Sequence, residues 1–585
     1  MKWLAVDFET SDTNAYTCRF AGVGYQVFDP EGKVPTCPAQ YAVDELGAVL
    51  KQYEDYPVVM HNASFDLILE HRLGVRPTVV HDTMLMAKHI HNNWPAYDLK
   101  SLAWYHFSDT YQPLLALKNW FREQRVHVDD EQDMDYTKAP VELVAPYCKH
   151  DIRMTILLTQ LFWPKLKNHY AYNLDAECIR YDNDMKERGL VANLPFYKDM
   201  ARLGRRRMKY NLDRARFHMG VEGNPKGNAL QEHLKKLGET RQTKTKRMAT
   251  GDVVLREWKG KDKSIGSIMR VKADEKNVNT YALNVLEVAT PLTKHPDLGV
   301  FHAQHMQSAA VTRRYKCRGL HGRNGVVAKG QVQNFPPIMR EGIVVLPGYE
   351  FWKEDMASIE ARMFSGMMSL LIGEDHFAKL YRDDPWFNVY LHVLAECAGV
   401  HGATKKHELY TPYKHGTLGR LYGSSAKRFS IQLRDDFGIN YSVDRCAEIY
   451  ATIDRKFPFI RKFQGMLTAL ATKQGYVVDP FGAIYYVPKD ETYKVVAYIN
   501  QGAAGMVLKW WWSEAWKLMI ANREKGFDDY IFNTVHDEFD FAIQKKGNPK
   551  KRAQSYGDVL EGLDLFNLPL RAEVIGPVGN WRQAG

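Results

Sequence analysis

The chain has 585 residues, a formal net charge of +10 and 45% apolar residues. This length calls for several domains, and the apolar content is typical of a soluble globular protein. Seven cysteines without a C-x-x-C spacing argue against a disulfide framework and a zinc site, and favour a reducing cytoplasm. We see no signal peptide and no apolar run of membrane-spanning length, so we expect no membrane partner.

An apolar strand is predicted at residues 3–10, and it carries two acids near its end. Asp7 and Glu9 are two residues apart, so both carboxylates point to the same side of a sheet. A strand-edge acid pair in contact with solvent is the alternative interpretation, and for this feature alone it is the commoner one.

Two further pairs in the first 170 residues are each four residues apart. Asn62 with Asp66, and Tyr147 with Asp151, share a face if they are helical. Four carboxylates in an apolar site would mostly be protonated unless divalent cations held them, and hard oxygen ligands suit magnesium or manganese. Exposed helix faces are the alternative.

These residues resemble the proofreading 3′–5′ exonucleases of the DEDD type that carry a tyrosine in the last motif. The resemblance implies an α/β exonuclease domain of RNase H-like fold over residues 1–170. Strands and helices alternate up to the predicted helix at Tyr147 and Asp151, after which residues 157–166 are expected to begin a connector. The resemblance also implies a water oriented by Tyr147, a substrate contact by Asn62, and metal ions on Asp7, Glu9, Asp66 and Asp151. Because Asp7 lies so near the N-terminus, we expect no 5′–3′ nuclease domain before it and no primer removal by this chain.

A helical and basic segment is predicted at residues 171–330. Clustered cations are typical of a surface that binds the DNA backbone, and a solvated face is the alternative. The cations concerned are Arg205, Arg206, Arg207, Lys244, Lys246, Arg247, Lys259, Lys261, Lys263, Arg313, Arg314, Lys316 and Arg318.

A helix is predicted to start at Thr411-Pro412, with the threonine as cap, the proline at the first helical position and Lys414 in the first turn. A lysine at the positive end of a helix favours a triphosphate site. Lys414, Leu418 and Tyr422 follow at intervals of four and share a face, and Gly423 indicates the end of the helix. An ordinary surface helix is the alternative.

A β-hairpin is predicted around Val535-His536-Asp537-Glu538-Phe539, because side chains alternate with a period of two on both sides of the turn. Two adjacent carboxylates beside apolar strands are costly to bury unless a cation compensates. Together with Asp355, which lies far ahead in the chain, they favour a two-metal site for phosphoryl transfer. A solvated turn is the alternative.

In this order, Asp355 with Glu360, Lys414 with Tyr422-Gly423, and His536-Asp537-Glu538 resemble motifs A, B and C of family A DNA polymerases. The resemblance implies a right-hand polymerase domain after the exonuclease, with an α+β palm and helical fingers and thumb. The implied boundaries are 171–330 for the thumb, 331–368 and 470–585 for the palm, and 369–469 for the fingers.

The resemblance also implies residue roles. Asp355, Asp537 and the backbone carbonyl of Met356 would hold two Mg²⁺ ions, with Mn²⁺ as a substitute, while Lys414 would stabilise charge on the leaving group. Tyr422 would manage the templating base, Glu360 would exclude a 2′-hydroxyl, and Glu538 would support the site. The remaining implied substrate contacts are Asn334, Arg362, Leu418, Gln501 and His536.

Three features depart from the family pattern. The arginine-rich feature expected after Phe481-Gly482 is missing, and Ala483 and Ile484 stand in its place. The arginine four residues before the lysine is Tyr410 here, and Lys405, Lys406 and Arg420 are the candidates to replace it. The usual aromatic residue between the lysine and the tyrosine is Leu418. No metal ligand is lost, so we expect activity with altered nucleotide handling.

The resemblance implies a template-directed DNA polymerase with 3′–5′ proofreading, of the bacteriophage replicative type, working in the host cytoplasm. Its partners would be primer–template DNA and dNTPs, and a processivity factor, helicase or single-strand-binding protein is left open. A single-subunit RNA polymerase is one alternative, disfavoured by Glu360 and by the exonuclease domain. A non-catalytic DNA-binding replication scaffold is the other, disfavoured by the intact metal acids.

Overall fold

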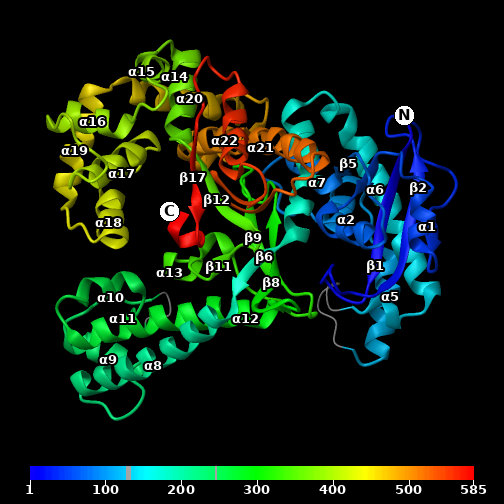
Figure 1. Cartoon of the computed structure of the whole chain (residues 1–585), viewed down its shortest axis with the longest axis horizontal. Coiled ribbons are helices and arrows are strands. Elements are labelled where there is room, and N and C mark those ends of the chain that lie inside the picture. The colour runs from blue at the N-terminus through cyan, green and yellow to red at the C-terminus, as the bar shows by residue number, and fades with distance from the viewer. Residues whose placement is uncertain (127–133, 244–246, 585) are drawn as a thin grey trace.

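The computed structural model describes residues 1–126, 134–243 and 247–584. Figure 1 shows an α/β domain at the N-terminal end, built on one mixed sheet in the order β3-β2-β1-β4-β5. β1 pairs antiparallel with β2 and parallel with β4. Almost every β1 side chain is buried, which explains its nearly continuous apolar sequence. The strands are β1 (Trp3–Thr10), β2 (Phe20–Phe28), β3 (Gln40–Ala42), β4 (Val58–Met60) and β5 (Val80–Asp82).

The predicted α/β fold of the first domain is confirmed. Its helices are α1 (Leu46–Lys51), α2 (Ala63–Arg72), α3 (Thr83–Ile90), α4 (Leu99–Phe107), α5 (Gln112–Glu123) and α6 (Val141–Leu166), with a 3₁₀ turn η2 (Tyr136–Lys138). The expectation that residues 157–166 form a connector is wrong, because they complete α6. Leu158, Phe162 and Leu166 are buried there, and that packing extends the helix.

Helix α7 (Tyr170–Arg188) joins the two halves of the chain. One face of α7 places Tyr172, Ala176 and Ile179 in the core of the first domain. Another face places Leu174 and Cys178, among others, in the core of the second half. α7 opens the predicted thumb segment of residues 171–330, and it is packed between two hydrophobic cores.

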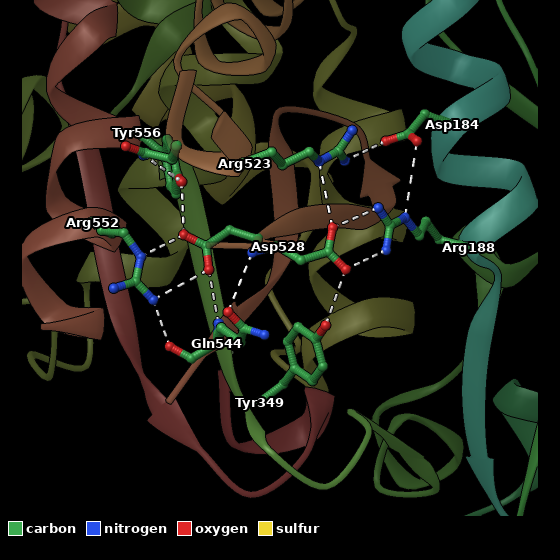
Figure 2. A network of polar contacts seen from close by, with 10 residues as sticks. Asp184, Arg188, Tyr349, Arg523, Asp528, Gln544, Arg552 and Tyr556 are labelled. Atoms are coloured by element: carbon green, nitrogen blue, oxygen red, sulfur yellow. Dashed lines mark hydrogen bonds and ion pairs between the residues drawn. The ribbon is translucent and has the colours of Figure 1, made fainter. Parts of the chain in front are cut away.

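The C-terminal end of α7 is fastened to the second half by ion pairs. Figure 2 shows Arg188 in a two-pronged contact with Asp528, whose oxygens lie 2.7 and 2.8 Å from the guanidinium nitrogens. Asp184, one turn earlier, accepts a hydrogen bond from Arg523 at 2.8 Å. These contacts fix α7 against both the start of β15 and the end of α21.

A helical arm extends from this junction, at the lower left of Figure 1. Its helices are α8 (Leu194–Met219), α9 (Asn228–Lys236), α10 (Asp252–Trp258), α11 (Lys263–Glu275), a π-helical segment η3 (Lys276–Ala282) and α12 (Leu283–Val288). The helices at the base of the arm pack against a sheet in the order β10-β9-β8-β6-β11, with β7 also paired to β8. These strands are β6 (Leu190–Asn193), β7 (Thr290–Leu292), β8 (His295–Met306), β9 (Lys316–His321), β10 (Val327–Ala328) and β11 (Ile343–Val344). Residues 171–330 are thus only partly helical.

A four-stranded antiparallel sheet in the order β15-β16-β12-β17 forms the centre of the second half. Its strands are β12 (Tyr349–Met356), β15 (Tyr530–Val535), β16 (Glu538–Gln544) and β17 (Ala572–Val578). The adjoining elements are η4 (Val332–Asn334), α13 (Pro337–Arg340), α14 (Ile359–Ile372), α21 (Val495–Glu524), α22 (Pro549–Asp558), η6 (Val559–Gly562) and η7 (Trp581–Ala584).

A helical subdomain, yellow in Figure 1, lies beside this sheet. It contains α15 (His376–Asp383), α16 (Val389–Ala398), α17 (Tyr410–Leu421), α18 (Ala426–Phe437), α19 (Val443–Lys456) and α20 (Phe459–Gln474). The chain returns through the small hairpin β13 (Tyr476–Val478) and β14 (Ile484–Tyr486) and the turn η5 (Lys489–Lys494).

All seven cysteines lie in the described part of the chain, and each has a free thiol. Among the described residues, every helix is too short or too polar to cross a lipid bilayer.

Candidate active sites

The predicted hairpin of β15 and β16 is present, and its turn holds Asp537. His536 adopts a left-handed backbone conformation with φ of 60°, which makes the turn tight. The Met356 backbone N–H donates to the Asp537 carbonyl at 3.0 Å, and Asp355 lies directly opposite Glu538 on the neighbouring strand. The hairpin therefore brings the three predicted acids to one end of the sheet.

Electrostatics at this end of the sheet favour a bound cation. Burial and the neighbouring Asp537 carboxylate raise the pKa of Asp355 to about 7. Burial also raises the pKa of Asp537, against the opposing effect of the Arg314 guanidinium. A cluster of carboxylate oxygens that resists ionisation on its own fits a hard divalent cation such as Mg²⁺.

Lys353 is a member of this cluster that sequence reasoning missed. Its ammonium lies 2.5 Å from a Glu538 oxygen and 3.8 Å from an Asp355 oxygen. The signal was present, since Lys353 precedes Asp355 by two positions on β12 and so shares its face. The Glu538 carboxylate thus forms an ion pair with Lys353.

A cavity of 380 Å³ lies between the acids and α17. Lys414 and Leu418 line it from the helix, as predicted. Several lining residues were not predicted as site residues, among them Asn388, Tyr390 and Glu573. The cavity lining brings together, among others, Asp355, Met356, Glu360, Tyr410, Lys414, Leu418 and Asp537.

Glu360 is held at both of its carboxylate oxygens. One accepts a hydrogen bond from Arg314 and the other from the Tyr422 hydroxyl, each at 2.6 Å. Asn500 on α21 donates to the same hydroxyl at 2.8 Å. This chain of contacts fixes Glu360 and Tyr422 relative to each other at the edge of the cavity.

The start of α17 differs from the prediction. The helix begins at Tyr410, its N-cap is Leu409, and no side chain caps it. Thr411 and Pro412 therefore lie inside the first turn, and Lys414 lies one turn into the helix. Tyr410 is buried, and this tertiary packing outweighs the local capping preference of threonine. The predicted stop is confirmed, with Gly423 at a φ of 74°.

The structure separates the three candidates for the missing arginine. Lys405 lines the cavity and lies 3.5 Å from Glu573. Arg420 instead forms an ion pair with Asp454. Lys406 is absent from the described lining of the cavity.

Four of the expected substrate contacts lie away from the cavity. Arg362 is only 1% exposed, and it donates at 2.7 Å to the Ala357 carbonyl and also to the carbonyls of two prolines, so the expectation of a substrate contact is wrong. Asn334 lies in η4 and donates to Gln331 at 2.5 Å. His536 is exposed at the hairpin turn, and Gln501 is half-buried on α21.

The second acid cluster forms in the first domain. Asp7 and Glu9 project from β1, and Asp66 on α2 accepts the Phe8 backbone N–H at 3.2 Å. Asp151 lies on α6, where it is buried and 2.8 Å from the Lys100 ammonium. The four predicted acids thus come from one strand and two helices that pack together.

Two further predicted residues flank these acids. Tyr147 lies one turn before Asp151 on α6, with its ring stacked on Tyr136 at 5.7 Å. Asn62 is the N-cap of α2, with φ of 65°, rather than part of the helix.

A close approach of α6 to the sheet assembles this cluster. Gly24 lies opposite Asp7 on β2, and a Cβ atom at Gly24 would lie 2.7 Å from the Cys148 Sγ atom. Only glycine lets the helix come so near. Cys148, which sequence reasoning missed, places its Sγ 3.5 Å from Asp7 Oδ2.

The charge distribution of this cluster also fits divalent cations. Burial, followed by the Asp7 carboxylate, raises the pKa of both Glu9 and Asp66 well above the usual values. One oxygen of Glu9 and one of Asp151 are buried without a hydrogen-bond partner. Ligand atoms of Asp7, Glu9 and Cys148 all lie within 4.8 Å of one another. Such oxygen donors suit Mg²⁺ or Mn²⁺.

The predicted DNA-backbone cations have several different surroundings. Arg313 is buried and donates to the Ile484 carbonyl at 3.1 Å, and Arg314 is paired with Glu360. Expecting these two at a DNA surface is therefore wrong. Lys244 and Lys246 lie outside the described residues.

The central antiparallel sheet and the helix that faces its acids have the arrangement of a right-hand polymerase domain. The α/β domain before it, with its own acid cluster, has the arrangement of an exonuclease domain. Family models agree: "3′-5′ exonuclease" matches residues 1–167 and "DNA polymerase family A" matches residues 216–583. The chain belongs to DNA polymerase family A.

Individual relatives are distant. DNA polymerase I of Pseudomonas aeruginosa is 24% identical over 99% of this chain, which spans 63% of that protein. The DNA polymerase of Mycobacterium phage D29 is 24% identical over 37% of the chain and 34% of its own length. That of Escherichia phage T5 is 26% identical over 35% of the chain and 26% of its own length. The chain thus spans less than two thirds of these relatives.

A solved structure shares the fold over the whole chain. The polymerase domain of Pol1 from M. smegmatis, in complex with DNA primer–template and dNTP, aligns with a TM-score of 0.76 at 16% identity. The alignment covers 100% of this chain and 96% of that one.

Proposed function

We propose that this chain extends a primer on a DNA template and removes mispaired 3′ nucleotides. The observation that carries the proposal is the cavity in which Asp355 and Asp537 share a space of 380 Å³ with Lys414. Acids on one side and a helix-borne lysine on another can bind the two ends of a nucleoside triphosphate. The separate acid cluster of Asp7 and Glu9 supports the proofreading activity.

Divalent cations, Mg²⁺ or Mn²⁺, are the proposed cofactors of both sites, two in each. Asp355, Asp537 and the Met356 carbonyl would hold those of the polymerase site. When bound, the cations activate the attacking oxygen and neutralise charge on the leaving oxygen. The ligands in the exonuclease site would be Asp7, Glu9, Asp66 and Asp151.

In the polymerase site, Lys414 holds the triphosphate and stabilises charge on the departing pyrophosphate. Lys405 provides the second cation, since it lines the same cavity while Tyr410 occupies the position of the family's arginine. Its ion pair with Glu573 is largely exposed, so releasing Lys405 to a phosphate costs little.

The nucleotide sugar and base are read by neighbouring residues. Glu360 blocks a 2′-hydroxyl, and Leu418 packs beside the sugar. Tyr422 manages the templating base, while Gln501 and His536 contact the primer strand. These roles rest on the family resemblance together with the placement of Glu360 and Leu418 in the cavity lining.

In the exonuclease site, Tyr147 orients the attacking water and Asn62 contacts the strand. A mispaired end reaches this site more readily than a paired end, because unpairing it costs less free energy. Primer–template DNA and dNTPs are the proposed partners. The matches to two phage polymerases support phage genome replication.

Primer extension with Mg²⁺ tests this function. We expect extension of a DNA primer with dNTPs but not with NTPs, and removal of a mispaired 3′ nucleotide when dNTPs are withheld. Asp537→Asn should abolish extension and leave removal intact. Extension with NTPs alone would favour an RNA polymerase, and no reaction with either pool would favour a DNA-binding scaffold.

A further inference from the structure

One of the four exonuclease acids, Glu9, lines a cavity of 480 Å³ that both halves of the chain enclose. Glu9, Asn62 and Phe65 line it from the first domain. Met306 of β8 and Arg318 of β9 line it from the sheet that supports the helical arm. One wall of the exonuclease cavity is therefore built by the polymerase half.

The surroundings of this cavity suit a nucleotide strand. Phe8, Phe65 and Met306 offer apolar surface for bases, and Asn62 offers an amide. The volume is in the range of sites that bind small molecules of nucleotide size. An entering strand also carries phosphates, and these need a cation beyond the reach of the acid cluster.

Arg318 is the only lysine or arginine among the described residues that line the cavity. Its side chain is exposed and forms no ion pair with the described part of the chain. His321 also lines the cavity, but burial lowers its pKa to about 4, so it is neutral at physiological pH. The neighbouring Arg313 and Arg314, by contrast, are both engaged inside the protein.

The wall that carries Arg318 is fastened to the first domain. Tyr16 stacks on His302 of β8 at 4.0 Å, and its hydroxyl lies 3.3 Å from the Gln304 amide nitrogen. Asn14, which is buried, donates to the Gly322 carbonyl at 2.9 Å. These contacts set the position of β9 relative to the acids on β1, so Arg318 is pre-positioned without a conformational change.

We propose that Arg318 binds a backbone phosphate of the frayed primer strand and so positions its 3′ end for the exonuclease acids. The inference rests on the proposed proofreading function. It assigns part of the exonuclease substrate site to the polymerase half of the chain. Arginine suits this task because its planar donors match the phosphate oxygens.

Steady-state degradation of a single-stranded oligodeoxynucleotide by the full chain, with Mg²⁺, tests the proposal. Arg318→Ala should raise KM about tenfold, the effect of one charge-assisted hydrogen bond, with kcat within about twofold of wild type. The slope of log(1/KM) against log salt should flatten by about one. Arg318→Lys should restore part of the loss.

Lys329→Ala is the matched control, since Lys329 is exposed just after β10, the strand paired with β9, and does not line the cavity. We expect it to leave KM unchanged, and we expect Arg318→Ala to leave extension of a paired primer unchanged. Equal effects of the two substitutions, no effect of Arg318→Ala, or an equal loss of extension would each overturn the proposal. Absence of degradation by the wild-type chain would instead overturn the proposed proofreading function.

Discussion

Glu360 is a carboxylate held at both of its oxygens at the edge of the polymerase-half cavity. Arg314 and Tyr422 each bind one of its oxygens at 2.6 Å, so the carboxylate cannot swing out of the cavity. A side chain that cannot move aside strongly disfavours binding of a ligand with an additional group, such as a 2′-hydroxyl, at the same place.

We predict that Glu360→Ala admits ribonucleotides at least tenfold more readily, which corresponds to about 1.4 kcal/mol. Glu360→Gln keeps the volume and should preserve most of the discrimination. Single-turnover incorporation of a dNTP and the matching NTP measures the ratio. An unchanged ratio in the alanine variant would show that Glu360 does not face the sugar.

Glu70 is a buried acid that the proposed mechanism does not use. It is 1% exposed on α2, neither oxygen has a hydrogen-bond partner, and burial raises its pKa from 4.5 to about 8. The folded state therefore holds the proton more tightly than the unfolded chain. The protonated Glu70 thus contributes to the free energy of unfolding. This contribution is fully present below pH 4.5 and is lost as the pH rises through 8.

We predict that Glu70→Met removes this pH dependence. Each pKa unit corresponds to about 1.4 kcal/mol, so the variant should gain stability on the order of 5 kcal/mol relative to wild type near pH 9. The two proteins should differ far less at pH 5, which provides the internal control. Urea unfolding at both pH values measures the difference, and a constant offset between them would contradict the burial argument.

At the scale of elements, the central hairpin is anchored at its base by two adjacent acids in different surroundings. Asp528 is 41% exposed and meets Arg188, as Figure 2 shows. Asp529 is fully buried and accepts hydrogen bonds from Arg552 at 2.6 Å and from Tyr556 at 2.8 Å. Asp528 and Asp529 are adjacent acids of the same type in the sequence, but only the ion pair of Asp529 with Arg552 is buried away from water.

We predict that Asp529→Ala destabilises the protein by ~3–5 kcal/mol, because it leaves the Arg552 guanidinium buried without its partner. Asp528→Ala should cost about 1 kcal/mol or less, because water screens and replaces an exposed pair. Midpoints of urea unfolding for the two variants measure the contrast. Equal losses of unfolding free energy in the two variants would mean that Asp529 is more accessible to water than the structure indicates.

At the scale of the whole molecule, the two acid clusters belong to separate sheets joined through α7. Asp7 and Glu9 lie on β1 of the first sheet, and Asp355 lies on β12 of the central sheet. Each sheet has its own hydrophobic core. Loss of one cluster should therefore leave the other assembled.

We predict that Asp7→Ala with Glu9→Ala abolishes 3′-end degradation and keeps primer extension within about twofold, as expected for distant independent sites. Asp537→Ala should do the reverse. Parallel assays of the two activities, with circular dichroism to confirm folding, make the comparison. Joint loss in a folded variant would show that the sites are coupled through α7.

The acids, the strands and helices that carry them and the hairpin around Asp537 were predicted from the sequence alone. These features are local, since the two-residue and four-residue spacings record which side chains share a face. The sequence-based prediction misplaced the start of α17, because the burial of Tyr410 is a tertiary effect. It also did not show that α7 is shared by two cores, because one sequence cannot reveal which cores share a helix.

The positions of the lysine and arginine side chains relative to the two acid clusters could be seen only in the folded structure. Lys353, Arg314, Arg318 and Lys405 are similar charged residues in the sequence. Lys353 lies against Glu538 and Arg314 against Glu360, whereas Arg318 lines the cavity beside Glu9 and Lys405 lines the cavity beside Asp355. All four placements depend on residues far apart in the chain. A charge pattern carries no record of such contacts, because a solvated lysine and a buried one have the same side chain until packing removes the water.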